Sequence, residues 1–317
     1  LLEAMSEQWQ PGRNHTPDSS SNATNPPHEP TQERRWGEHL GANPAVLIHG
    51  YYPDLLKQIL DPIAPFQKTT DLDLYVSTPH HQLDAVEELL RSQGWPRVTL
   101  VGVENRGRDI APFLLELLPR AMAFGHTWLA KLHTKRSKQT PGGEQWGQHL
   151  SSSLASTEGL KAINALFASE NPPGLVSPAG SLLPTTICLA RNQGHLRHLL
   201  NKVQMDQHWF LQQRFVAGSM WAARRGVLAP LLSLPVQLQD FEPESGQIDG
   251  TLAHAIERLI PALTEAKGTA SATLQGSTDA CPPFGHPWAN PNLIAPMRHN
   301  PEPAQCRGER RPSTPHY

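Results

Sequence analysis

The sequence predicts an α/β fold built on a mostly parallel, Rossmann-like sheet flanked by helices. Short apolar runs at residues 45–48, 72–78 and 98–103 have the length and composition of buried strands. Each run is followed by a segment whose apolar residues recur at the spacing of a helix. Because this alternation is typical of βαβ units, we expect parallel strands with helices on both faces of the sheet.

The third of these strands continues into the clearest motif of the chain, a turn at residues 104–108 that leads into a helix. Asp109 is suited to cap that helix. The apolar stripe of the helix comprises Ile110, Phe113, Leu114, Leu117 and Leu118. A glycine turn before a helix directs free amides and the positive dipole end toward an anion. Arg106 and Arg108 flank Gly107 and would suit phosphate oxygens, unless they are solvated side chains of a capped turn.

Proline is unevenly distributed along the 317 residues and marks the expected domain boundaries. Residues 1–43 and 264–317 are rich in Pro, Ser, His and charged residues and lack regular apolar spacing. Such segments bury too little apolar surface to fold, so we expect two disordered tails. The segment 44–263 between them has the length of one α/β domain.

The composition argues against several classes of partner. A net charge of −2 offers no basic surface for nucleic acid. The three cysteines, Cys188, Cys281 and Cys306, lack the spacing of a metal site, which favours a reduced, cytoplasmic protein. No apolar stretch reaches the length of a membrane helix, and no secretory signal is recognisable at the start of the sequence.

Polar residues are expected at the carboxyl ends of the parallel strands, where α/β sheets bind their ligands. His49 and Tyr51 follow the first strand, and Thr78 ends the second. The run from Asn105 to Asp109 follows the third strand. We therefore expect these residues to line one ligand site.

The fourth expected strand, at residues 127–132, runs into a basic segment. Lys131, His133 and Lys135 alternate along it and so share one face of the strand. Three potential cations at the end of a strand would suit a diphosphate, and a charged Lys131 within an apolar strand is costly without a partner. A basic loop on the surface is the alternative.

The later part of the chain offers residues for acceptor binding and acid–base chemistry. Residues 215–223 are small and apolar and are expected to form one strand, which carries Gly218 and Ser219. The acidic loop that follows contains Asp240, Glu242, Glu244 and Asp249. An Asp held at the edge of a ligand site can act as a general base. Alternatively, Asp249 is no more than the N-cap of the helix that starts near residue 251.

Several catalytic motifs are absent from the sequence. It contains no G-x-G-x-x-G fingerprint, no Walker lysine, no G-x-S-x-G elbow and no H-E-x-x-H pair. A Rossmann oxidoreductase is therefore disfavoured, and no zinc site of the H-E-x-x-H type is expected.

Six segments resemble, in their order along the chain, the rhamnan synthesis F family of bacterial cell-surface polysaccharide and lipopolysaccharide assembly. They read VLIHGYYPDLL, DLYVST, VENRGRDIAPFL, LAKLHTKRS, FVAGSMWAARRGVLAPLL and FEPESGQIDGTLAHAIERLI. They span residues 45–260 and none of the tails. That family is in turn similar to GT-A type glycosyltransferases, which bind a nucleotide sugar on a Rossmann-like half-sheet. The resemblance implies a rhamnosyltransferase that uses a nucleoside-diphosphate donor such as dTDP-rhamnose.

The same resemblance implies roles for individual residues. Asp249 falls where inverting transferases keep their catalytic carboxylate, and the stretch from Asn105 to Arg108 corresponds to the one that closes over the nucleotide sugar. Gly218, Ser219, Glu242 and Glu244 lie on the acceptor side. Many such enzymes hold a divalent metal with Asp-x-Asp where this chain has Lys131-Leu132-His133. We therefore expect neither a metal nor another cofactor.

The resemblance also implies partners and a location. The acceptor would be a glycan or a lipid-linked glycan, and the protein would work in the cytoplasm, at the inner face of the plasma membrane with membrane-bound assembly machinery. The alternative from a different class is a non-catalytic sugar- or nucleotide-binding module of a polysaccharide assembly complex.

Overall fold

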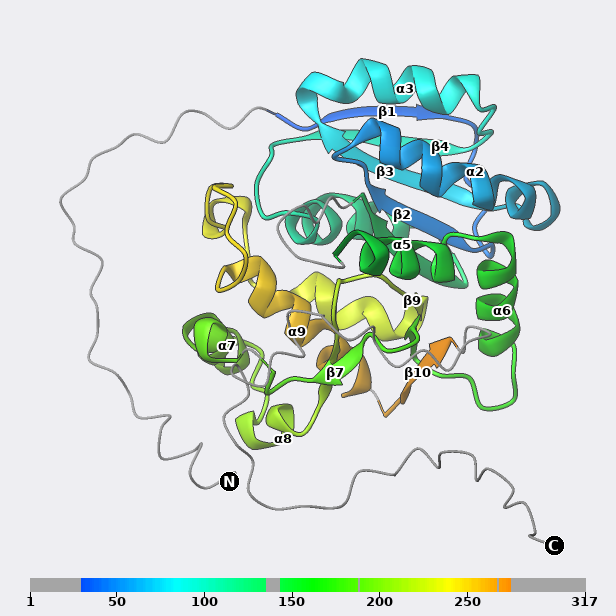
Figure 1. Cartoon of the computed structure of the whole chain (residues 1–317). Coiled ribbons are helices and arrows are strands. Elements are labelled where there is room, and N and C mark those ends of the chain that lie inside the picture. Colours follow the sequence, from blue (N-terminus) through cyan, green and yellow to red (C-terminus); the bar gives the residue numbers. More distant parts are fainter. Residues whose placement is uncertain (1–29, 135–142, 188, 267, 275–317) are drawn as a thin grey trace, which may run out of the picture. The chain divides into compact units, whose positions relative to one another are not determined.

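An eight-stranded sheet organises the part of the chain that the structure describes, with the strand order β1-β4-β3-β2-β5-β9-β6-β10 (Figure 1). The structure is a computed structural model and describes residues 30–134, 143–187, 189–266 and 268–274. The strands of this sheet are β1 (Gln32–Trp36), β2 (Ala45–His49), β3 (Asp73–Pro79), β4 (Val98–Val103), β5 (Trp128–His133), β6 (Leu175–Pro178), β9 (Trp221–Arg224) and β10 (Ser271–Leu274).

Parallel pairing dominates the half of the sheet that the alternating pattern predicts. β2 is parallel to both β3 and β5, and β3 is parallel to β4. β10 is also parallel to β6, whereas β1 and β9 run antiparallel to their neighbours. Parallel neighbours require crossover connections, which the intervening helices provide. The predicted fold class, a mostly parallel α/β sheet flanked by helices, is confirmed.

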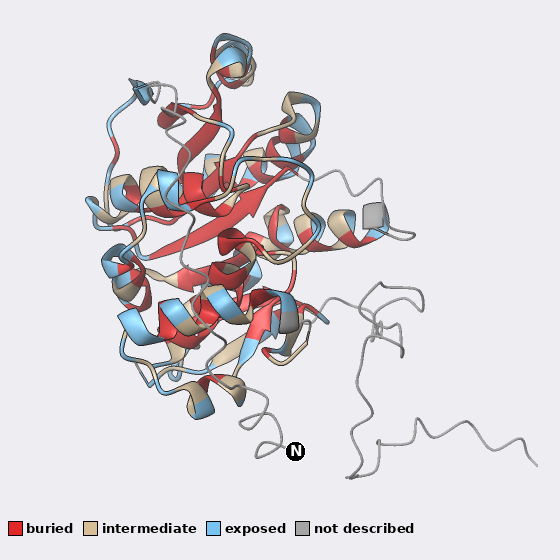
Figure 2. Ribbon diagram, turned by 90° about the vertical axis from the view of Figure 1, so that its left-hand side faces the viewer, coloured by how far each residue is buried: buried red, intermediate tan, exposed pale blue. Residues whose placement is uncertain are grey.

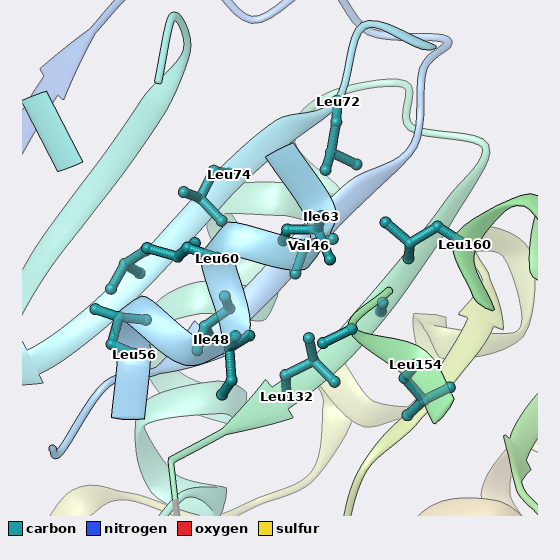
Figure 3. Packing of buried hydrophobic residues seen from close by; sticks show 14 of the residues in the cluster. Val46, Ile48, Leu56, Leu60, Ile63, Leu72, Leu74, Leu132, Leu154 and Leu160 are labelled. Carbon is teal, nitrogen blue, oxygen red and sulfur yellow. The ribbon is translucent and has the colours of Figure 1, made fainter. Parts of the chain in front are cut away.

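One face of the sheet is covered by α2 (Pro53–Thr70), α3 (Leu83–Ser92), α5 (Gly143–Leu154) and α6 (Thr157–Phe167). Their apolar stripes pack on every second residue of the strands, including Val46, Ile48 and Leu132 (Figure 3). Figure 2 shows the central strands buried and the outer sides of the helices exposed. Burial of this apolar surface is the main source of stability. None of the described helices combines the length and apolar character that crossing a membrane requires.

The opposite face carries the helix that follows the Gly107 turn. After two α-helical residues, Ile110 and Ala111, it becomes a π-helix, η2 (Pro112–Leu117), and continues as α4 (Leu118–Met122). Pro119 has no amide hydrogen with which to continue an α-helical pattern, which accounts for the widened turn. The stripe predicted to be apolar is buried at Ile110, Phe113, Leu114, Leu117 and Leu118. Because strand residues alternate, Lys131 and His133 face this side of the sheet.

The helix α9 (Leu252–Glu265) packs against η4 (Arg225–Ser233), α7 (Gln193–Lys202), the 3₁₀ turn η3 (Ala190–Asn192) and β8 (Arg214–Val216). β8 pairs with β7 (Leu182–Pro184) in a second, two-stranded sheet. The remaining elements are α8 (Gln207–Leu211), the 3₁₀ turn η5 (Leu238–Asp240), and the 3₁₀ turn η1 (His80–Gln82), which lies beside α3 and β4. The expectation of a single strand at residues 215–223 is wrong, because β8 and β9 belong to different sheets. Gly218 and Ser219 have φ angles of 88° and 55°, which turn the chain between them.

The described fold extends beyond the predicted domain at residues 44–263 on both sides. β1 adds an edge strand to β4, and β10 pairs with β6. The expectation of disordered tails is therefore wrong for residues 32–43 and 271–274, while residues 1–29 and 275–317 lie outside the described part. Composition missed β1 because backbone pairing stabilises an edge strand even when its side chains are polar.

A buried histidine fixes the segment between β1 and β2. His39 Nε2 lies 2.8 Å from Thr99 Oγ1, and His39 Nδ1 lies 3.0 Å from Asp73 Oδ2. The His39 ring also stacks on Tyr75, with 4.8 Å between the ring centroids. These contacts make residues 37–43 part of the folded unit.

Starting the chain at residue 44 should destabilise the fold, because this removes β1 and takes His39 away from buried Asp73. We expect a thermal midpoint at least about 5 °C below that of a chain starting at residue 30, which corresponds to a loss of roughly 2 kcal/mol. Scanning calorimetry of the two trimmed chains measures the difference. Equal midpoints would show that β1 and His39 contribute nothing to stability.

Candidate functional site

A buried ion pair between Lys131 and Asp109 lies at the carboxyl end of β5. Lys131 Nζ is 2.5 Å from Asp109 Oδ2, and the two side chains are 2% and 14% exposed. Nζ also donates to the backbone oxygen and to Oγ of Ser219, at 2.8 and 2.9 Å. All three ammonium hydrogens thus have acceptors, as a buried lysine requires. The predicted role of Lys131 as a diphosphate ligand does not fit this geometry, because its charge and donors are used within the protein.

Lys131 joins two turns whose backbones are left-handed. Gly107 and Arg108 have φ angles of 69° and 57°, and Gly218 and Ser219 have φ angles of 88° and 55°. This conformation costs roughly 1–2 kcal/mol at a residue with a Cβ atom. Asp109 follows the first turn and Ser219 belongs to the second, so one ammonium group holds both turns together.

The expectation that Asp109 caps the following helix is wrong. Its carboxylate accepts a hydrogen bond from Lys131, and no hydrogen bond joins it to the first amides of the helix in the described part of the chain. An unpaired buried ammonium costs several kcal/mol, whereas a missing cap costs about 1 kcal/mol. The ion pair therefore determines the orientation of Asp109.

Two histidines complete the surroundings of Asp109. His133 Nδ1 lies 3.4 Å from Asp109 Oδ2, and His133 is the register partner of His49 on β2. Burial opposes ionisation of Asp109, but His133 and Lys131 hold the pKa of its carboxyl well below the usual range. Burial lowers the pKa of His49 to about 4, although the charge of Asp109 opposes this shift. The structure thus gathers four of the predicted site residues at one edge of the sheet.

Arg106 binds the acidic loop that precedes α9. Its Nε donates to the backbone oxygen of Phe241 at 2.7 Å, and its Nη2 donates to that of Gln239 at 3.2 Å. Arg106 also forms an isolated β-bridge with Pro243. A Cβ atom on Gly107 would lie 2.8 Å from the ring of Phe241, so only glycine permits this close packing. Arg106 and Gly107 therefore attach the loop to the turn after β4.

Arg108 binds the same loop but does not use all of its hydrogen-bond donors. Its Nη1 donates to the backbone oxygen of Gln247 at 2.7 Å, and its backbone N–H donates to Glu244 Oε1 at 2.9 Å. Within the described residues its guanidinium has no carboxylate partner, and Nε and Nη2 make no hydrogen bond. These two nitrogens can receive phosphate oxygens in a bidentate manner.

Asp249 is buried in an ion pair with an arginine of α9. Its side chain is 7% exposed and lies 3.6 Å from Nη2 of Arg258, and Asn192 Nδ2 donates to it at 3.0 Å. Asp249 is not the N-cap of α9, because Thr251 occupies that position. Sequence reasoning missed Arg258 and Asn192. The available signal for Arg258 was its place beside the apolar stripe of α9, whereas nothing singled out Asn192.

The first turn of α9 holds further candidate residues. His254 Nδ1 lies 2.7 Å from Thr251 Oγ1, and burial together with Arg108 lowers the pKa of His254 to about 4. His254 is therefore neutral near pH 7. Glu242 accepts the backbone N–H of Leu252 through both carboxylate oxygens, at 3.2 and 3.0 Å. Glu242 thus stabilises the positive end of the helix dipole.

Other residues predicted to lie on the acceptor side also make contacts within the protein. Glu242 Oε1 lies 3.0 Å from His195 Nε2. The backbone N–H of Gly218 donates to Glu257 Oε1 at 2.9 Å. Glu244, like Glu242, orders the acidic loop through backbone contacts rather than standing alone. Glu242 and Gly218 thus connect the site to α7 and α9, and Glu244 connects the loop to the turn after β4.

The remaining predicted ligand residues differ in their access to solvent. Tyr51 is partly exposed beside His49, and Asn105 is exposed at the tip of the turn. Thr78 is fully buried and donates to the backbone oxygen of Gly50 at 2.9 Å, so it cannot contact a ligand in this arrangement. Lys135 lies outside the described residues.

Carboxylates and histidines are not arranged as a metal centre in the part of the chain that the structure describes. The one Asp-x-Asp sequence, Asp71 to Asp73, begins β3 at the opposite edge of the sheet, where Asp73 pairs with Arg97 at 2.6 Å. That the protein binds its donor without a metal remains a prediction.

Comparison with known proteins identifies the family. Residues 29–269 match the family model described as Rhamnan synthesis protein F. The chain belongs to this family. The matched range includes β1, in agreement with the extended start of the domain in the structure, and ends just before β10. The resemblance seen in the sequence is thereby confirmed.

This rhamnan synthesis F family member is also similar to individual proteins. The chain is 34% identical over 215 residues to "Uncharacterized protein WxcX" from two strains of Xanthomonas campestris pv. campestris. The aligned part covers 68% of this chain and 30% of WxcX. Among solved structures, glucosyl-3-phosphoglycerate synthase from Mycobacterium tuberculosis in complex with uridine diphosphate matches with a TM-score of 0.37 and 17% identity, over 76% of this chain and 74% of that one.

Replacing Lys131 with Met should destabilise the protein by about 3–5 kcal/mol, because Asp109 is left as an unpaired buried charge. Urea unfolding measures the loss. The double variant Lys131→Met with Asp109→Leu should recover part of it. As a control, Lys57→Met removes an exposed ion pair with Asp61, where the side chains are 55% and 51% exposed, and should cost under about 1 kcal/mol. Similar losses for both single variants would contradict the structural role of Lys131.

His49 should make the stability depend on pH. Its pKa of about 4 lies below the value of about 6.5 expected in the unfolded chain, so the folded state binds fewer protons between these values. Stability is then lost as the pH falls from 6.5 toward 4. Urea unfolding at pH 7 and pH 5 should show that His49→Gln removes about 1–2 kcal/mol of this difference. An unchanged pH dependence in the variant would contradict the assignment.

Proposed function

We propose that this chain is a glycosyltransferase domain that moves a sugar from a nucleoside-diphosphate donor to a glycan acceptor. The observation that carries the proposal is that Arg108, in the turn after β4, binds the backbone oxygen of Gln247, two residues before Asp249. Arg108 has unused guanidinium donors, and Asp249 has a carboxylate held by Asn192 and Arg258. Membership of the rhamnan synthesis F family supports the reaction class.

The reaction divides between these two side chains. Asp249 accepts the proton of the acceptor hydroxyl as the acceptor oxygen bonds to the anomeric carbon. The bond from that carbon to the phosphate oxygen breaks, and the nucleoside diphosphate leaves with the electron pair. Arg108 stabilises the negative charge that grows on the departing diphosphate. Neutral His254, whose Nδ1 is occupied by Thr251, has its Nε2–H available as a further donor to a substrate oxygen.

The finer assignment follows the family description. We propose that the transferred sugar is rhamnose, carried by dTDP, and that the acceptor is a cell-surface glycan or its lipid-linked precursor. We further propose that the reaction takes place in the cytoplasm, at the inner face of the plasma membrane. There the protein would work together with membrane-bound assembly machinery. No metal is required in this proposal, because fixed cations supply the positive charge.

A panel of nucleotide sugars tests the proposal most broadly. A true donor should raise the thermal midpoint of the full chain, because ligand that binds only the folded state stabilises it by mass action. The same donor should be transferred or slowly hydrolysed by the purified protein. Stabilisation without any turnover would favour the non-catalytic sugar- or nucleotide-binding module. Activity that requires magnesium or manganese would overturn the metal-independent form of the proposal.

Asp249→Asn should lower turnover by about two to four orders of magnitude with little change in donor affinity, because the base contacts the acceptor. The variant also leaves Arg258 without its counter-ion, so stability must be measured in parallel. The double variant Asp249→Asn with Arg258→Met removes both charges and should regain stability without regaining turnover. If the double variant regains turnover, Asp249 is a counter-ion and not the base.

A further inference from the structure

The carboxylate of Asp249 is held through one of its two oxygens. Asn192 Nδ2 lies 3.0 Å from Oδ1, and Arg258 Nη2 lies 3.6 Å from the same atom. Oδ2 makes no hydrogen bond with any described residue. The two contacts therefore fix the orientation of the carboxylate while leaving one oxygen available to another molecule.

Arg258 is itself held firmly. It is 1% exposed, its Nη1 donates to the backbone oxygen of His254 at 2.9 Å, and its guanidinium carbon lies 4.9 Å from the ring centroid of Phe215. Its Nε is buried and has no hydrogen-bond partner among the described residues. A guanidinium stays charged in proteins, and a buried charge with an unsatisfied donor lowers stability. Replacing a whole buried ion pair with apolar residues of similar volume is often neutral or stabilising, so stability alone does not explain the pair of Arg258 and Asp249.

Asn192 reaches Asp249 from a different element. It is fully buried at the end of η3, directly before α7, whereas Arg258 lies in the second turn of α9. The loop that carries Asp249 is attached by Arg106 and Arg108 to the turn after β4. Two separate elements thus contact one carboxylate, and a third segment holds the loop that carries it, which is typical of a group whose position matters.

We propose that Arg258 and Asn192 are positioning residues that hold Asp249 Oδ1 so that Oδ2 meets the acceptor hydroxyl. The proposal rests on the proposed transferase function, in which Asp249 takes the proton of that hydroxyl. A general base must lie within hydrogen-bond reach of the proton it removes, and a misplacement of 1 Å can cost about 100-fold in rate. Both residues contact Asp249 and not Arg108, the proposed diphosphate ligand, so we expect their loss to lower turnover without weakening donor binding.

The test uses the full chain with dTDP-rhamnose as the first donor and with dTDP as the probe of binding. Arg258→Met and Asn192→Leu should each lower kcat per folded molecule by about 10–100-fold. The affinity for dTDP, measured by calorimetry, should stay within about 2-fold. Arg258→Lys keeps the charge and should regain at least about tenfold in kcat over Arg258→Met.

Arg225 offers a matched control, because it follows β9 beside the start of β5 and not beside its carboxyl end. Arg225 is a partly buried arginine whose Nη2 donates to the backbone oxygen of Met122 at 2.8 Å. Arg225→Met should leave kcat unchanged. If Arg258→Met keeps normal kcat, loses dTDP affinity in parallel, or behaves like Arg225→Met, the positioning role is wrong.

The proposed function and the positioning role fail in different ways. If the wild-type protein turns over no nucleotide sugar, the transferase function fails. A crystal structure of Arg258→Met then decides the positioning role separately. A rotated or displaced Asp249 carboxylate supports it, and an unmoved carboxylate overturns it.

Discussion

The site depends on the buried ammonium group of Lys131. Burying this charge within an apolar strand is tolerable only because Asp109 and Ser219 supply three acceptors. Those acceptors sit in or beside two left-handed turns that lie far apart in the sequence. One interaction therefore fixes the turn after β4 against the turn before β9, and the acidic loop is attached to the first of these through Arg106.

The cations of the site have separate tasks. Lys131 and Arg258 each face a buried carboxylate, and Arg106 is bound to backbone oxygens of the loop. The charges of Lys131 and Arg258 are therefore paired with carboxylates, and the donors of Arg106 are bound within the protein. Arg108 alone among these four has no carboxylate partner among the described residues, and two of its guanidinium nitrogens make no hydrogen bond there. A basic sequence motif therefore does not by itself indicate how many of its cations contact an anionic substrate.

Local patterns predicted the parts of the fold that have a regular period. The predicted apolar stripe from Ile110 to Leu118 was correct because the helical period identifies the residues that face the sheet. The prediction that Lys131 and His133 share one face was correct because strand residues alternate between the two faces of a sheet. Patterns failed where contacts between distant residues decide the structure. β1 looks polar yet pairs with β4, and Asp109 looks like a cap yet pairs with Lys131. No local signal could reveal that Asn192 contacts Asp249 across 57 residues.

A crystal structure of the full chain with dTDP tests the central claim most directly. The account predicts a diphosphate within hydrogen-bonding distance of the Arg108 guanidinium, with the Lys131–Asp109 pair intact and Asp249 facing the space beyond the phosphates. A diphosphate that displaces Asp109 from Lys131 would contradict the account. So would one that avoids Arg108 and binds in the groove on α3 beside Arg34 and Arg91.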